Sequence, residues 1–131
     1  MNGALKKLND NVRVLIQQDL PVFMYMEPDT KGNDKIKISP AKLLKFLEDR
    51  GFQIYDGKVI FIDNGIGQQV EDSFVFQYCL DYVKEFNDEA LESIFITVGE
   101  SLLITKKGTL LGLKKCIYSP VTDGRNTAYY F

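Results

Sequence analysis

The chain has 131 residues, of which 45% are hydrophobic and 26% charged, and its formal net charge is −2. This length and composition are typical of one globular domain with its own core, and they exclude a mostly disordered chain. Because histidine is absent, Ser-His-Asp and Cys-His nucleophile systems, His-ligated zinc and histidine pH switches are excluded as well.

The charges are unevenly distributed along the chain. Residues 1–62 carry ten basic and eight acidic side chains. Residues 63–100 carry one basic and nine acidic side chains, and residues 101–131 carry five basic side chains and one acidic side chain. An acidic middle beside a basic tail favours two functional faces, although a solvated acidic helix and ordinary surface lysines would give the same pattern.

Neither the cysteines nor the hydrophobic runs indicate export or membrane insertion. Cys79 lies in the apolar run 74–80 and is expected to be a small core residue, while a disulfide with Cys116 stays open. No run reaches the roughly 18 apolar residues of a membrane-spanning helix, and the N-terminus lacks the apolar segment of a signal peptide. We therefore expect a cytoplasmic protein without a membrane partner.

The N-terminal part predicts a helix followed by an extended segment. Residues 3–18 place one apolar stripe at helical spacing, formed by Leu5, Leu8, Val12, Leu15 and Ile16. Pro21 ends this helix, because proline cannot continue the hydrogen-bond ladder. The apolar run 22–26 is expected to be a buried strand or an extended segment.

The next stretch predicts a loop, a short strand and a helix. A polar loop over 27–34 precedes the alternating strand 35–38. Ser39-Pro40 starts a helix, because serine caps free amide groups and proline fits the first turn. The helix runs to about Arg50, and Gly51 is its C-terminal cap. Its inward-facing residues are Leu43, Leu44 and Leu47.

Two tight turns predict a small meander of strands. Asp56-Gly57 separates the β-rich runs 53–55 and 58–62, which is a strong signal for a hairpin. Residues 63–65 form a second turn, after which 66–70 is expected to add a third strand.

Two helices are expected to follow the meander. The first spans 71–86, and its apolar residues are so numerous that we expect burial on most sides. Asn87-Asp88 ends this helix and caps the second one. The predicted apolar face of the second helix consists of Leu91, Ile94, Phe95, Val98 and Leu102.

The C-terminal part gives weaker signals. Residues 109–118 fit a strand or a short helix, 119–124 a loop, and 127–131 a strand. The aromatic end at Phe131 suggests a cut inside a longer protein. Together these elements predict a single α+β domain over 1–131, in which a small antiparallel sheet (a hairpin or meander) packs with about four helices.

No motif predicts catalysis. The segment 51–59 superficially resembles a phosphate-binding loop, but its glycine spacing is wrong and valine follows its lysine. The carboxylate pairs Glu48-Asp49 and Glu71-Asp72 are adjacent in sequence, so they point apart on a helix. Ser101 and Ser119 have no evident general base. We therefore expect a non-catalytic protein without a metal site or cofactor.

Basic side chains provide the candidate binding residues. One cluster consists of Lys35, Lys37, Lys42 and Lys45, and a second, near Tyr118, Tyr129 and Tyr130, consists of Lys106, Lys107, Lys114, Lys115 and Arg125. Lysine neutralises phosphates and exposed tyrosine stacks on bases, so these clusters predict nucleic-acid contact. The alternatives are that they are solubility lysines around core tyrosines, or that residues 40–62 imitate a winged helix.

Several segments in order show a family resemblance. They are a helix with a Gly-Phe turn (38–52), a hairpin (59–64), an acidic turn before a helix (70–83) and the closing segment 123–131. This order resembles the N-terminal or accessory region of phage and mobile-element replication proteins of the primase–helicase type. The primase and ATPase motifs of that family are absent here, so the resemblance implies an accessory segment for DNA contact, assembly or spacing.

Our leading prediction is therefore a non-catalytic accessory module of a phage-like replication protein, which contacts DNA or a protein partner. The alternative is a stand-alone interaction protein, either a homodimer or an adaptor.

Overall fold

The structure is a computed structural model that describes residues 20–106, 108–116, 120–123 and 126–130, the last two ranges by their backbone alone. The helix expected over 3–18 lies outside the described residues, as do the predicted site residues Lys107 and Arg125.

Two antiparallel sheets and several helices confirm the predicted α+β class. The first sheet pairs β1 (Met24–Pro28) with β2 (Asp34–Ile38). The second has the strand order β3-β4-β5-β7-β6 and consists of β3 (Phe52–Tyr55), β4 (Lys58–Asp63), β5 (Ile66–Gln69), β7 (Asn126–Tyr130) and β6 (Pro120–Asp123). The helical elements are α2 (Pro40–Asp49), α3 (Asp72–Lys84), α4 (Glu89–Ile94), the π-helical turns η1 (Phe95–Gly99) and η2 (Ser101–Thr105), and α5 (Gly108–Leu111).

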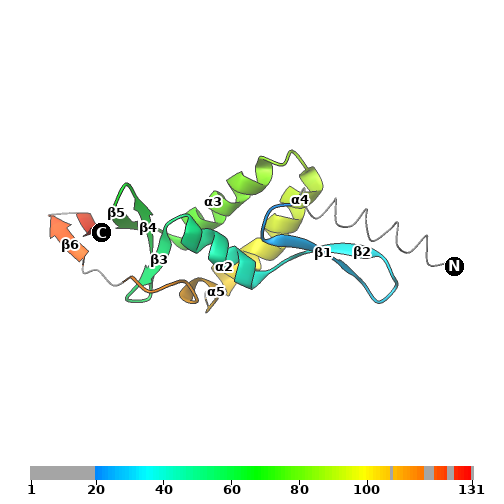
Figure 1. Cartoon of the computed structure of the whole chain (residues 1–131), viewed down its shortest axis with the longest axis horizontal. Helices are drawn as coiled ribbons and strands as arrows, with labels where there is room; N and C mark the ends of the chain where they lie inside the picture. Colours follow the sequence, from blue (N-terminus) through cyan, green and yellow to red (C-terminus); the bar gives the residue numbers. More distant parts are fainter. Residues whose placement is uncertain (1–19, 107, 117–119, 124–125, 131) are drawn as a thin grey trace.

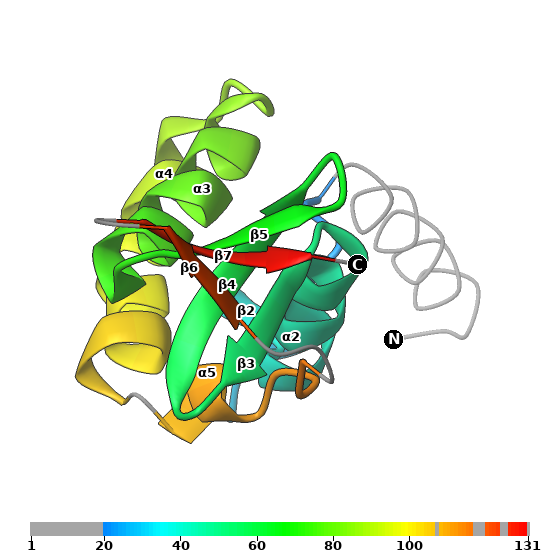
Figure 2. The same cartoon turned by 90° about the vertical axis from the view of Figure 1, so that its left-hand side faces the viewer.

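The molecule is elongated, with its two sheets at opposite ends (Figure 1). The β1–β2 hairpin extends from one end, and the helices lie between it and the larger sheet. Figure 2 looks at the larger sheet from its own end, where β6 and β7 lie in front of the β3-β4-β5 meander.

The first strand begins later and ends later than the apolar run predicts. It starts at Met24 and extends to Pro28, because Glu27 and Pro28 pair with Lys35 and Asp34 across the hairpin. The predicted loop over 27–34 is therefore shortened to the residues between the two strands.

Helix α2 begins and ends as its sequence predicts. The Ser39 side chain accepts a hydrogen bond from the backbone N–H of Lys42, and Pro40 opens the first turn. After Arg50, Gly51 adopts a φ of +99°, and a side chain there would lie 2.5 Å from the carbonyl oxygen of Ile62. Glycine thus allows both the helix end and the close approach of β4.

The meander forms through two turns of the same kind. Asp56 and Gly57 have φ values of 50° and 73°, and Asn64 and Gly65 have values of 53° and 78°. Positive φ at both central residues is the signature of a type I′ hairpin turn, so both predicted turns are confirmed.

The C-terminal part adds two strands to one side of the meander and an isolated bridge to the other. Residues 120–123, predicted as loop, form β6, because they pair with β7, which in turn pairs with β5. On the other side, Lys114–Cys116 runs parallel to β3: the N–H of Ile54 donates to Lys114 and that of Cys116 donates to Ile54. In its described part, 109–116, the predicted segment thus contains the end of a short helix and then an extended piece; residues 117 and 118 lie outside the described residues.

The last long helical segment buries part of the predicted face: Leu91 and Phe95 are buried as expected, and Ile94 and Leu102 are half-buried. Its buried residues recur at every fourth position and are Leu91, Phe95, Gly99 and Leu103. Val98, predicted to be in the core, is 38% exposed. The cause is the two π-helical turns, whose i→i+5 hydrogen bonds lengthen the repeat beyond the 3.6 residues on which the prediction rests.

Helix α3 has an exposed side, contrary to the prediction that it is buried on most sides. Gln77 and Asp81 lie on its surface and share a hydrogen bond of 2.8 Å, and Phe74 is 43% exposed. Its buried residues are Val75, Cys79, Leu80 and Val83.

One cluster of buried side chains connects the hairpin base, the helices and the larger sheet. Phe23 has no exposed surface and lies at its centre, with ring centroids 5.1 Å from Phe46, 5.7 Å from Phe95 and 5.9 Å from Tyr82. A smaller cluster of Ile60, Cys116 and Tyr55 lies apart from it.

Candidate nucleic-acid interface

A hollow of about 410 Å³ lies beside helix α2 and gathers basic and aromatic side chains. Its lining consists of Val22, Lys42, Lys45, Phe46, Asp49, Arg50 and Tyr82. Two of the predicted lysines, Lys42 and Lys45, therefore share one face of α2, as their spacing of three residues requires. We call this feature the α2 hollow.

Arg50 lies over the aromatic side of the α2 hollow. Its guanidinium carbon is 4.9 Å from the ring centroid of Phe46 and 5.4 Å from that of Tyr82. The two rings are themselves 4.7 Å apart. Stacking on aromatic faces restrains a guanidinium while its N–H groups remain able to bind an anion.

The charges of the α2 hollow are mostly uncompensated. Among the described lining residues Asp49 is the one carboxylate, and this group lies 3.9 Å from the Lys45 ammonium, with the two side chains 63% and 77% exposed. Such an exposed pair contributes little and exchanges readily with a competing anion. Three cations against one carboxylate leave the hollow electropositive.

The other predicted lysines lie on different elements. Lys35 and Lys37 are two residues apart on β2, so they share one face of the hairpin. Lys37 donates to Glu27 over 2.8 Å, and this hydrogen bond, together with the attraction of the carboxylate, raises the pKa of Lys37. The positive charge of Lys37 is therefore partly neutralised by Glu27 within the hairpin.

The lysines of the C-terminal cluster that the structure describes are exposed. Lys106 follows η2, while Lys114 and Lys115 lie on the segment beside β3. Lys115 lines a hollow of about 330 Å³ with Tyr55 and Asp56, so a carboxylate is present there as well.

Sequence reasoning missed Arg50 and Tyr82. Arg50 could have been predicted as a site residue, because it follows Lys42 by about two helical turns. Tyr82 comes from α3, and no local signal places it beside α2.

The thiol of Cys79 is buried in the core. Its side chain is a free thiol with no exposed surface, so no disulfide joins it to Cys116. Burial raises the pKa of Cys79 to about 12, so the thiol stays protonated at neutral pH.

Metal-binding clusters and membrane-spanning helices are both absent from the part of the chain that the structure describes. Over the described residues, no group of three or more Cys, Asp or Glu side chains is placed to hold a metal ion. Within the same part of the chain, no helix has both the length and the apolar character needed to cross a bilayer.

No protein-family model, curated protein or solved structure matches the chain. The resemblance to accessory regions of replication proteins therefore stays a prediction.

Proposed function

We propose that the protein is a non-catalytic module that contacts nucleic acid through the α2 hollow, in the manner of an accessory segment of a replication protein. The observation that supports this proposal most is the position of Lys42, Lys45 and Arg50 around the rings of Phe46 and Tyr82.

The chemistry of the α2 hollow suits a polynucleotide. Lysine ammonium groups neutralise phosphates and release counterions, and this term accounts for most of the affinity of a sequence-independent contact. Tyr82 is only partly buried, so its ring offers a surface for a base of an unpaired strand beside these cations. No enzyme chemistry is required of the site.

The test is a fluorescence anisotropy titration of the full chain with labelled single-stranded and duplex DNA at low and high salt. We expect Lys42→Glu/Lys45→Glu to weaken binding at least about tenfold and to lower the salt slope by about two. The matched control is Lys31→Glu/Lys58→Glu, which makes the same change in net charge at exposed positions in or beside turns. Equal loss in both variants, or no salt-sensitive binding of the native chain, would contradict the proposal.

The alternative is a self-associating adaptor, and light scattering separates it from the proposal. A stable dimer that binds neither form of DNA would support the adaptor.

A further inference from the structure

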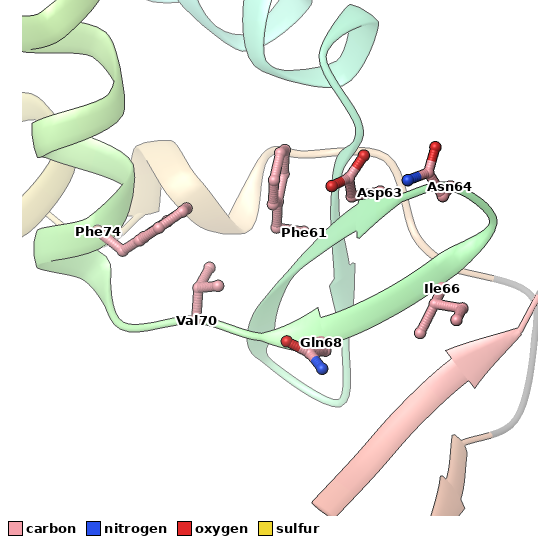
Figure 3. Close-up of a pocket in the computed structure, with 7 residues that line it drawn as sticks. All are labelled: Phe61, Asp63, Asn64, Ile66, Gln68, Val70 and Phe74. Atoms are coloured by element: carbon pink, nitrogen blue, oxygen red, sulfur yellow. The ribbon is translucent and has the colours of Figure 1, made fainter.

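A second hollow, of about 460 Å³, lies at the larger sheet (Figure 3). It is bounded by β4, β5 and the start of α3, and we call it the β4–β5 hollow. Its lining residues are Phe61, Asp63, Asn64, Ile66, Gln68, Val70 and Phe74.

The β4–β5 hollow has an apolar part because the core face of the sheet extends beyond the helices that cover it. Side chains alternate along β4, so Val59, Phe61 and Asp63 share one face. Val59 is 5% exposed, whereas Ile66, which pairs with Asp63 on the next strand, is 42% exposed. The burial of this face therefore ends partway along the strands.

Phe74 closes one side of the β4–β5 hollow without filling it. Its ring centroid lies 5.8 Å from that of Phe61, and the two side chains converge from α3 and β4 in Figure 3. Phe74 is nevertheless 43% exposed. Two large apolar side chains, Phe74 and Ile66, thus leave surface open at one site, which is typical of a binding surface rather than of scattered exposed residues.

The backbone around the β4–β5 hollow offers no strand edge. Strand β5 pairs with β4 on one side and with β7 on the other. A partner therefore cannot bind by extending the sheet at β5, and the side chains must provide the contact.

The polar groups of the β4–β5 hollow define the charge of its partner. Asp63 provides a carboxylate, and Asn64 and Gln68 provide amides that can hydrogen-bond a peptide backbone. Among the lining residues that the structure describes there is neither Lys nor Arg, and the exposed Glu71 follows Val70 directly. An acidic surface of this kind repels nucleic acid and anionic lipid and attracts a cationic segment.

We propose that the β4–β5 hollow binds a protein partner through a peptide segment in which one large apolar side chain is flanked by basic residues. The apolar side chain packs against Phe61, Ile66 and Phe74, and a neighbouring lysine or arginine pairs with Asp63. This site does not depend on the α2 hollow, so it can operate whether or not the protein binds nucleic acid.

The first experiment titrates the ¹⁵N-labelled full chain with the capped peptide Gly-Lys-Lys-Phe-Lys-Lys-Gly and follows amide chemical shifts. We expect saturable shifts centred on β4, β5 and the start of α3. A peptide with alanine in place of phenylalanine should bind at least about tenfold more weakly, because the apolar contact is lost. A peptide with glutamate in place of lysine should give no shifts there. Shifts that do not saturate, or that centre on another surface, would overturn the proposal.

The second experiment changes the protein. Phe74→Ala should abolish saturable binding, whereas Leu111→Ala should not, although Leu111 is 54% exposed on α5. Asp63 lies at the exposed end of β4, so we expect the Asp63→Lys variant to fold. This variant should bind the glutamate peptide more tightly than the lysine peptide. Equal effects of the two alanine variants, or an unchanged charge preference in a folded Asp63→Lys protein, would reject the site.

Discussion

At the scale of single residues, the buried thiol of Cys79 makes a specific prediction about alkaline stability. Its pKa is about 12 in the folded protein against a reference value of 9.0. Above about pH 9 the unfolded chain releases a proton that the native protein retains, so the free energy of unfolding falls as the pH rises towards 12. For one proton this slope approaches about 1.4 kcal/mol per pH unit.

The measurement is urea unfolding of the native protein and of Cys79→Ala between pH 8 and pH 11. Near pH 8 the variant should be less stable because a core sulfur is removed, but its stability should fall less steeply with pH, so the difference between the two proteins should shrink as the pH rises. The two proteins differ only at residue 79, so the difference between the two slopes isolates the thiol. Parallel curves would show that Cys79 ionises in the native state.

At the scale of elements, two helix starts form a natural comparison. The Asp88 carboxylate precedes α4 and accepts hydrogen bonds from the N–H groups of Ala90 and Leu91, over 2.9 and 3.3 Å. Glu71 holds the corresponding position before α3, but its side chain makes no capping hydrogen bond. We expect Asp88→Ala to lower the free energy of unfolding by about 1 kcal/mol, because two N–H groups lose their acceptor.

Glu71→Ala is the matched control and should change stability by much less, since it removes only a favourable charge near the helix start. Chemical denaturation of both variants followed by circular dichroism makes the comparison. A loss for Glu71→Ala as large as that for Asp88→Ala would mean that charge, rather than the hydrogen bonds, stabilises these helix starts.

At the scale of the whole molecule, the rings of the core connect the hairpin to the helices. Phe23 precedes β1 and contacts rings from α2, α3 and η1. We expect Phe23→Ala to reduce the free energy of unfolding by about 3–5 kcal/mol, because a fully buried ring leaves a cavity that several elements share. Phe74→Ala should cost less than half as much, since that ring is 43% exposed.

Urea unfolding followed by both circular dichroism and tyrosine fluorescence tests this prediction. If one core unites the elements, the two signals should change together in each variant. Loss of the hairpin alone in Phe23→Ala, with the helices intact, would show that the hairpin folds separately from the rest.

Local signals in the sequence determined where most elements begin and end. Ser39-Pro40, Asp56-Gly57, Asn64-Gly65 and Asp88 each act on backbone groups within a few residues, so their effect requires no knowledge of the fold. These positions defined α2, the meander and the start of α4. Lys42 and Lys45, which lie on α2 and line the α2 hollow, were also predicted from the sequence as binding residues.

Only the tertiary structure decided which surfaces these elements expose. Strand β6 exists because β7 pairs with it, and Val98 faces outward because π-helical turns change the helical repeat. Tyr82 meets Arg50, and Phe74 stays open beside Ile66, through packing between segments distant in the chain. Whether an apolar side chain is covered depends on what the rest of the fold places over it, and a local sequence pattern does not contain that information.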